Sequence, residues 1–466
     1  MQIPILSGIY TDSNSDFRTS YPRNLIPVPK ENGLANGYLR PSEGIVQFAE
    51  TPNIDRGGIN WNGVCYRVSG NKLITVASDG SVSEIGEVKG SGYCNFDYSF
   101  DYLAINSNPY LYLFSPNEGL KQVTDSDLGK VQDVIWVDGY FMTTDGQYLV
   151  ISELNDPFQV NPLKYGSSEV DPDPINALFK LRNEVYALNR YTTEVFSNTG
   201  GENFPFSRID GAMSTRGTLA ANTCCLFLET IAFLGSGKNE PISIYLNANG
   251  STQKIATREV DQILRNYKEE QLANSLVESR ILDGHQWLYI HLPDKCLVYD
   301  SAASQATNQQ VWFFLCSGFG ESRYLAQNHV WCYDKWIVGH PFQAKLGMLT
   351  NSSGEHWGEI TEWAFNTQII FNESHGAIFH QLELICLAGR TLFGSSPAIC
   401  TQYSVDGIEW SNPKYISAGK NGQRDKRLVW FQQGHMNNWR IQKFTGTSES
   451  RLSIARLEAQ LEPLGV

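Results

Sequence analysis

Histidine and cysteine, the residues that most often carry chemistry, are scattered along this chain without a catalytic or metal-binding spacing. The eight histidines form no HExxH motif and no local nucleophile motif with cysteine or serine. The nine cysteines form no CxxC pair and no cysteine–histidine cluster with zinc spacing. We therefore interpret the histidines as strand and turn residues and the cysteines as buried thiols of a reducing compartment. The sequence indicates no catalytic, metal-binding or cofactor-binding residue, and no cofactor.

Two further motifs are weak signals for an enzyme or a phosphate contact. Ser404 to Trp410 (SVDGIEW) resembles the Asp-box turn of sialidase-type propellers, but it is one residue short and occurs once. A plain Asp-Gly hairpin explains it better. The basic run from Gly422 to Arg427 is short and lacks interleaved aromatic residues. We interpret it as a solvated loop, with a phosphate contact as the minority alternative.

Residues 257–300 contain the one helical pattern in a chain that otherwise alternates as strands do. Val260, Ile263, Leu264 and Tyr267 have the i, i+3, i+4, i+7 spacing of a single helical face. The phase then breaks, which predicts two short helices, at about 259–266 and 269–274, with Thr257 as an N-cap. After them the period changes to two, as in a meander of antiparallel strands.

The polar face of the predicted helices is a candidate partner interface. It carries four residues: Arg265, Lys268, Glu269 and Gln271. The alternative is equally compatible with the pattern, because any amphipathic helix uses the same spacing to pack its apolar face on a neighbouring sheet.

Composition and charge describe a soluble β protein that does not wrap nucleic acid. The chain has 466 residues, 12% aromatic residues, 40 glycines and a charged fraction of 18%, which suits many short strands with glycine turns. The start of the chain lacks the features of a signal peptide, and no window is long and apolar enough to cross a bilayer. The formal net charge of −13 opposes phosphate binding but would let a duplex slide past an acidic wall.

Between residues 57 and 360 one unit recurs without close sequence identity: three apolar strands separated by short polar turns. This is the pattern of β-propeller blades, and the irregular spacing allows six or seven of them. The units are recognised by their turns and hairpins, near residues 61–63, 98–103, 137–139, 181–183, 226–234, 283–284 and 331–338.

From about residue 361 the pattern shifts to longer alternating strands, which predict a β-sandwich. These strands are expected at residues 379–387, 398–405, 427–432, 439–444 and 452–461. The predicted fold class is all-β. Its predicted domains are an irregular N-terminal arm over 1–50, with closure of the propeller as its candidate role, a propeller over 51–360 with a helical insertion at 258–278, and a sandwich over 361–466.

Several stretches, taken in order, resemble one protein family. The strongest lie at residues 261–267, 270, 272–273, 277–279, 290–293 and 297–300, with support at 24–25, 37–40, 44–45, 66–68, 70, 72–73, 406–408, 425–427 and 430. Together they resemble the tail hub proteins, also called packaged-DNA stabilisation proteins, of short-tailed double-stranded DNA bacteriophages. The similarity spans nearly the whole chain and is patchy between about residues 90 and 250.

The resemblance implies a non-enzymatic virion protein that is made in the cytoplasm of a bacterial host and assembled into the phage tail. In that family six copies form a ring below the portal and its adaptor ring. The ring closes and extends the DNA exit channel, stabilises the packaged DNA, and carries tailspikes and a tail needle. DNA would pass through the channel without sequence-specific binding.

Two other functions remain open on the residues alone. A propeller glycoside hydrolase or sialidase-like enzyme would need repeated Asp boxes and converging acids or arginines. A monomeric protein-binding propeller would need neither ring-forming flanks nor the helical insertion.

Overall fold

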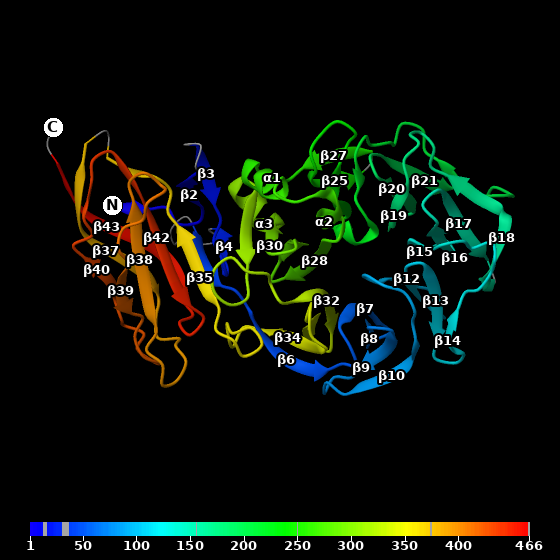
Figure 1. Ribbon diagram of the computed structural model, residues 1–466, viewed down its shortest axis with the longest axis horizontal. Coiled ribbons are helices and arrows are strands. Elements are labelled where there is room, and N and C mark those ends of the chain that lie inside the picture. The colour runs from blue at the N-terminus through cyan, green and yellow to red at the C-terminus, as the bar shows by residue number, and fades with distance from the viewer. Residues whose placement is uncertain (13–15, 30–36, 155, 249, 373–374, 465–466) are drawn as a thin grey trace.

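The computed structural model describes residues 1–12, 16–29, 37–154, 156–248, 250–372 and 375–464. These residues form an elongated molecule with a β-propeller at one end and a β-sandwich at the other (Figure 1). The predicted fold class is confirmed. The helices in the described residues are short: α1 (Arg258–Leu264), α2 (Glu269–Ala273), α3 (Ser301–Thr307) and one 3-10 turn, η1 (Ala221–Thr223).

Seven antiparallel sheets, numbered here as blades 1 to 7, surround the propeller axis (Figure 1). Each predicted turn or hairpin lies in a different blade. Blade 1 contains β7 (Asp55–Trp61), β8 (Val64–Ser69), β9 (Lys72–Val76) and β10 (Val82–Glu87); blade 2 contains β11 (Asn95–Tyr98), β12 (Leu103–Ser107), β13 (Tyr110–Ser115) and β14 (Gly119–Gln122); and blade 3 contains β15 (Asp133–Val137), β16 (Tyr140–Thr144), β17 (Tyr148–Glu153) and β18 (Asp156–Ser167). Blade 4 contains β19 (Ile175–Leu181), β20 (Glu184–Asn189), β21 (Thr193–Asn198) and β22 (Phe206–Arg208), and blade 5 contains β23 (Gly217–Thr218), β24 (Cys224–Phe227), β25 (Thr230–Ser236), β26 (Ser243–Ala248) and β27 (Ser251–Lys254). Blade 6 contains β28 (Leu276–Leu282), β29 (His285–His291), β30 (Cys296–Asp300) and β31 (Val311–Leu315), and blade 7 contains β32 (Gln327–Cys332), β33 (Lys335–Gly339) and β34 (Lys345–Thr350) with β6 (Gly44–Glu50).

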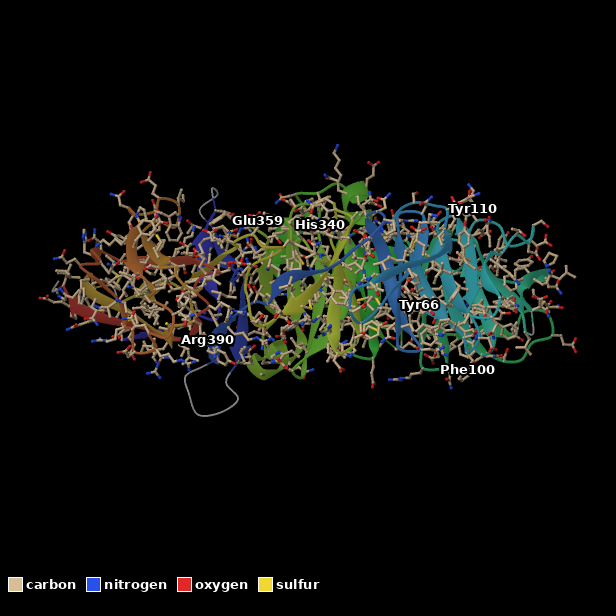
Figure 2. The ribbon with its side chains drawn as sticks, turned by 90° about the horizontal axis from the view of Figure 1, so that it is seen from below. Tyr66, Phe100, Tyr110, His340, Glu359 and Arg390 are labelled. Carbon is tan, nitrogen blue, oxygen red and sulfur yellow. The ribbon has the colours of Figure 1, made fainter. Side chains whose placement is uncertain are left out.

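Blade 7 is completed by a strand from the other end of the propeller sequence. Strand β6 pairs antiparallel with β34, so that Val46 lies opposite Met348 and Gly44 opposite Thr350. This pairing removes a free sheet edge and closes the ring without a covalent bond. A view turned by 90° places Phe100 and Tyr110 on opposite faces of the propeller disc (Figure 2).

The rest of the N-terminal segment belongs largely to the sandwich. Residues 1–50 are not an irregular arm: their described part forms β1 (Gln2–Ile3), β2 (Gly8–Thr11), β3 (Phe17–Ser20), β4 (Leu25–Pro29), β5 (Gly37–Pro41) and β6. Residues 13–15 and 30–36 of the predicted arm lie outside the described residues. Two prolines of this segment, Pro27 and Pro29, lie in β4 at the edge of its sheet, where a missing N–H is tolerated.

Two sheets pack face to face to form the sandwich. One has the order β4-β5-β43-β37-β40, with β1 paired to β43 and β41 paired to β37, and the other has the order β35-β42-β38-β39 with β36 beside β42. The expected strands are found at nearly the expected residues. Their bounds are β35 (Glu362–Asn366), β36 (Ile370–Phe371), β37 (Ala377–Leu387), β38 (Ala398–Ser404), β39 (Lys414–Ser417), β40 (Leu428–Phe431), β41 (His435–Met436), β42 (Trp439–Thr447) and β43 (Ser453–Pro463). The core between them includes Phe379, Phe444 and Leu457, and also Ile3 and Leu39 from the chain start.

The segment around Asn24 joins the two domains. Its backbone N–H donates to Phe314 O in blade 6 at 2.9 Å, and the neighbouring Arg23 N–H donates to Ala364 O in the sandwich at 2.9 Å. The Asn24 amide donates to Cys316 O at 3.0 Å and to Glu362 O at 2.7 Å, and its Oδ1 accepts from Cys316 N at 3.0 Å. One buried side chain therefore holds the end of β31, the outer strand of blade 6, to strand β35 of the sandwich.

The helices follow from local capping. Thr257 accepts from Val260 N and begins α1, as the sequence predicted, and α1 and α2 lie close to the expected ranges. Helix α3 was not predicted, because its sequence SAASQAT has no apolar periodicity. Asp300 starts it by accepting from Ala303 N at 3.0 Å, and Ser304 Oγ donates to Asp300 O at 2.6 Å.

Candidate functional site

The predicted partner interface lies in the connection between blades 5 and 6. The side chains of Arg265, Lys268, Glu269 and Gln271 are all exposed. Two of them are engaged within the chain: Glu269 accepts from Arg190 Nε at 2.9 Å, and Gln271 Oε1 accepts from the Lys268 N–H at 3.0 Å. Within the described residues, the Arg265 and Lys268 side chains have no hydrogen-bond or ion-pair partner. These two cations are the free part of the predicted face.

The apolar sides of the same helices are buried against their own blades. Val260, Leu264 and Leu272 belong to one core with Phe227 of blade 5 and Leu288 of blade 6. Tyr267 is partly buried against this core, and its hydroxyl bonds to Asp294. The helices therefore wedge between two blades, which accounts for their amphipathic pattern without a partner.

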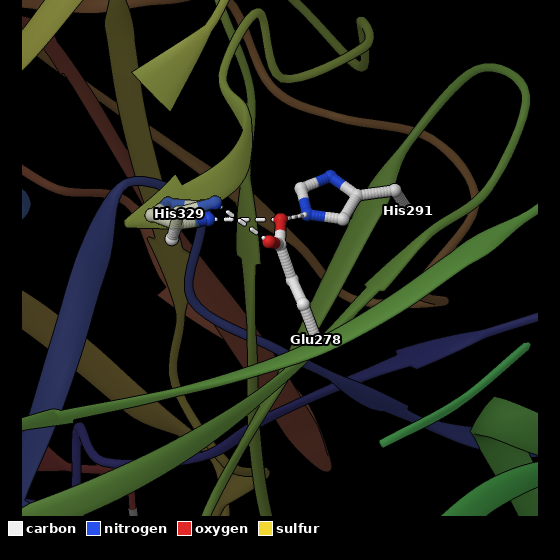
Figure 3. A group of neighbouring side chains, drawn as sticks. All are labelled: Glu278, His291 and His329. Atoms are coloured by element: carbon white, nitrogen blue, oxygen red, sulfur yellow. Dashed lines mark hydrogen bonds and ion pairs between the residues drawn. The ribbon is translucent and has the colours of Figure 1, made fainter. Parts of the chain in front are cut away.

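A cluster of titratable side chains that the sequence analysis did not single out lies at the junction of blades 6 and 7. Glu278 comes from β28, His291 from the end of β29 and His329 from β32 (Figure 3). Glu278 Oε1 accepts from His291 Nε2 at 2.7 Å and from His329 Nδ1 at 2.8 Å. An ionised carboxylate only accepts hydrogen bonds, so both ring nitrogens are donors.

The electrostatics of the cluster favour an ionised carboxylate. Burial raises the pKa of Glu278, but the His329 ring and the hydrogen bonds from His291 and His329 outweigh burial and hold that pKa well below its usual range. The backbone N–H groups of Asn328 and His329 donate to the same carboxylate at 3.2 and 2.8 Å. Burial lowers the pKa of His329, which therefore favours the neutral ring.

The two imidazoles are held in place by aromatic neighbours. The Tyr289 ring stacks on His291 at an interplanar angle of 9° and lies 4.7 Å from the His329 ring centroid. The Tyr324 ring also stacks on His291, with the two ring centroids 6.4 Å apart. Ring rotation is thereby restricted, and the ring nitrogens stay directed at Glu278.

Glu278 also has a structural role that recurs around the propeller. At successive junctions a carboxylate on one innermost strand accepts a backbone N–H from the next: Asp97 accepts from Trp136 N at 2.6 Å, and Asp133 from Leu178 N at 2.8 Å. Glu278 does the same with His329 N. Burial raises the pKa of Asp97, and raises that of Asp133 to about 7. Only at Glu278, among these three, do imidazoles reverse the shift.

Sequence spacing did not reveal this cluster. His329 is separated from Glu278 by three further strands, β29 to β31, and by α3, so no short motif contains all three residues. The predicted helical insertion at 258–278 included Glu278, and the strand pattern alone does not show that the three residues share a junction.

The Asp-box-like stretch is a hairpin turn. Asp406 Oδ1 accepts from Ile408 N and Glu409 N at 2.9 Å, and from Ser404 Oγ at 2.8 Å. These hydrogen bonds lower the pKa of Asp406. The carboxylate is thus used to hold its own turn.

Comparison with known proteins gives one family match for the propeller and one for the sandwich. The family model described as bacteriophage P22 Gp10, beta-propeller, matches residues 1–354, and the model described as bacteriophage P22 Gp10, beta-sandwich, matches residues 362–462. Among the curated relatives, the tail hub protein gp10 of Salmonella phage P22 is 25% identical over 482 residues, which cover 99% of each chain.

Two solved structures also match part of this chain, at low sequence identity. The N-terminal domain of Nup159 has a TM-score of 0.42 at 9% identity, over 71% of this chain and 98% of that chain. The Pan2 WD40 domain of Neurospora crassa has a TM-score of 0.42 at 8% identity, over 66% of this chain and 95% of that chain. Among the described residues, no helix is both long and apolar enough to cross a membrane. Because the two family models together account for almost the entire chain, this protein belongs to the bacteriophage P22 Gp10 family, the phage tail hub family that its sequence motifs resemble.

Proposed function

We propose that this chain is a structural tail hub protein of a double-stranded DNA phage, made in the host cytoplasm and assembled into the virion tail. Full-length similarity to a protein named tail hub protein gp10 supports this role. In finer detail, we propose that six copies form a ring below the portal and adaptor. That ring closes and extends the DNA exit channel, stabilises packaged DNA, and anchors tailspikes and a tail needle.

The observation that carries the proposal is the path of the N-terminal segment through both domains. Strands β1, β4 and β5 belong to the sandwich, whereas β6 completes blade 7. Pulling the domains apart therefore requires breaking sheet hydrogen bonds as well as the contacts of Asn24. A part that holds pressurised DNA must transmit force between its binding surfaces, and two domains joined in this way suit that task.

Net charge supports the channel role. With a formal charge of −13, the chain repels phosphate overall, so a wall built from its acidic surface would not retain DNA that slides past it. Neutralisation of many phosphates by clustered cations, the requirement for tight non-specific binding, is not expected.

The experiment that tests the role is electron microscopy of phage particles grown with a gold-labelled, C-terminally tagged copy of the chain. We expect label at the portal vertex, in the tail. Particles without label, together with free monomeric protein in the lysate, would contradict the proposal. A glycan hydrolysis screen on the same purified protein would then examine the enzyme alternative.

The exposed cations of the helical face provide a second test, on partner contact. The double substitution Arg265→Glu and Lys268→Glu reverses two charges that have no partner within the described chain. We expect it to block tail completion in a complementation assay while the thermal unfolding of the isolated protein stays unchanged. The matched control is Lys89→Glu with Lys130→Glu, which makes the same charge change at exposed positions elsewhere on the propeller. Equal infectivity of both double variants would remove the helical face as an interface.

A further inference from the structure

We propose that Glu278, His291 and His329 form a binding site for one divalent transition-metal ion, with zinc as the best match. The three side chains offer one carboxylate oxygen and two imidazole nitrogens, and these ligand atoms all lie within 4.8 Å of one another. Zinc takes this ligand set in proteins, with three protein ligands and a water molecule in the fourth position. The site joins two strands of blade 6 to one strand of blade 7 (Figure 3).

Burial of the cluster creates a need for positive charge. The exposed fractions of the Glu278, His291 and His329 side chains are 14%, 2% and 0%. The buried guanidiniums nearby are already paired, Arg280 with Glu43 and Arg67 with Asp55. Buried carboxylates that stay ionised are paired with a cation or coordinate a metal in proteins. A divalent ion supplies that charge, and the partly exposed Glu278 side chain leaves it a path to the site.

The present geometry needs only a small adjustment. Ligand atoms on a tetrahedral zinc lie about 3.3 Å apart, given zinc–ligand bonds of about 2.0–2.1 Å. The two nitrogen–oxygen contacts of 2.7 and 2.8 Å must therefore open by about half an ångström. Oε2 of Glu278 keeps its hydrogen bond from His329 N, and such second contacts orient a ligating carboxylate.

Proton balance is also satisfied at His329. When a neutral imidazole binds a metal through the nitrogen that carried its proton, that proton moves to the other ring nitrogen. The other nitrogen of His329, Nε2, is buried and has no partner among the described residues. Its lone pair is therefore available to take the proton. At His291 the same transfer moves the proton from Nε2 to Nδ1, so both imidazoles bind the metal as neutral ligands.

Metal titration of the purified full-length chain tests the site directly. The protein is produced with a histidine-free affinity tag, stripped with a chelator and titrated with cobalt(II), whose visible absorption reports tetrahedral nitrogen and oxygen ligands. We expect one equivalent of cobalt to bind, zinc to displace it, and zinc to raise the melting temperature by several degrees. Elemental analysis of the unstripped protein should show zinc near one ion per chain.

Variants separate this site from adventitious binding. His329→Gln and His291→Gln should each lose the cobalt absorption, whereas His380→Gln, an exposed histidine of the sandwich, should keep it. Because wild-type protein alone gives the primary readout, misfolding of a variant does not leave the proposal untested. Folded wild-type protein with no cobalt absorption and no zinc-dependent melting shift would show that the cluster is a hydrogen-bonded junction only. Cobalt absorption retained in both cluster variants would place the ion elsewhere and overturn the assignment.

Discussion

The propeller and the sandwich both bury whole arginine side chains, and they accommodate the charge in different ways. In the propeller, Arg67 donates to Asp55 at 2.8 Å, and Arg280 lies 2.6 Å from Glu43. In the sandwich, Arg440 lies between the rings of Phe379 and Tyr403, 3.9 and 4.0 Å from their centroids. No carboxylate of the described residues pairs with Arg440. In all three side chains Nε is buried without a partner.

The difference reflects what each arginine holds together. Arg67 belongs to blade 1 and also donates to the carbonyls of Asn328 and Ile337 in blade 7, so it lies at the closure of the ring. Its neighbour Asp55 raises the pKa of the guanidinium against the opposing effect of burial. Burial lowers the pKa of Arg440 to about 9. The propeller thus uses ion pairs at its closure, whereas the sandwich holds an unpaired cation inside one compact domain.

The largest effect is expected at the ring closure. Arg67→Met should lower the free energy of unfolding by about 3–5 kcal/mol, because it leaves the Asp55 carboxylate buried without its cation. Urea unfolding of the full-length protein measures this change. The control Arg427→Gln removes an exposed pair with Glu383, which solvent screens, so it should lower the free energy of unfolding far less. Similar losses in both variants would remove the distinction between buried and exposed pairs.

Arg280 has both an ion pair and aromatic contacts, so its substitution should lower the free energy of unfolding by an intermediate amount. It pairs with Glu43 and also lies over the rings of Trp287 and Trp336, at 5.4 and 5.2 Å. Arg280→Met keeps apolar contact with the two indoles, so we expect a loss of about 2–3 kcal/mol in the same unfolding assay. A loss as large as that of Arg67→Met would mean that the rings contribute nothing.

Substitution of the sandwich arginine should have a smaller effect. Arg440→Met removes a buried charge that has no ion-pair partner among the described residues. It also leaves two acceptors, Gln433 O and Gln442 Oε1, without their hydrogen-bond donor. These opposing terms predict a loss of about 1–2 kcal/mol. Differential scanning calorimetry should show the change in the sandwich transition. A loss larger than that of Arg67→Met would contradict the view that the ion-paired arginine of the propeller contributes more to stability than the unpaired arginine of the sandwich.

Asp133 is the acidic counterpart of Arg440, a buried charge-bearing group without an ion-pair partner among the described residues. Burial raises its pKa from 3.8 to about 7, so the folded protein retains a proton that the unfolded chain releases. The free energy of unfolding should therefore fall as pH rises between these values, by at most about 1.4 kcal/mol per pH unit from this group. The difference in pH dependence between wild type and Asp133→Asn isolates this contribution. Parallel curves would contradict the raised pKa.

Local sequence patterns predicted the elements well where an element forms from neighbouring residues. The blade hairpins, the two helices after Thr257 and the five sandwich strands each have their own alternation or cap. Helix α3 was not predicted because hydrogen bonds of Asp300 and Ser304 at its start stabilise it, and it has no apolar stripe. The cluster of Glu278, His291 and His329 was not predicted because these residues meet only when blades 6 and 7 pack together.

By itself the sequence determined the all-β class, the propeller followed by a sandwich, the position of the helices and the family, because these follow from short-range periodicity and ordered motifs. Tertiary structure decided that there are seven blades, that residues 44–50 complete the seventh, and that earlier N-terminal strands join the sandwich. It also decided which buried charges meet. Such pairings depend on which strand edge remains free after the rest has folded, and that information is spread over the whole chain.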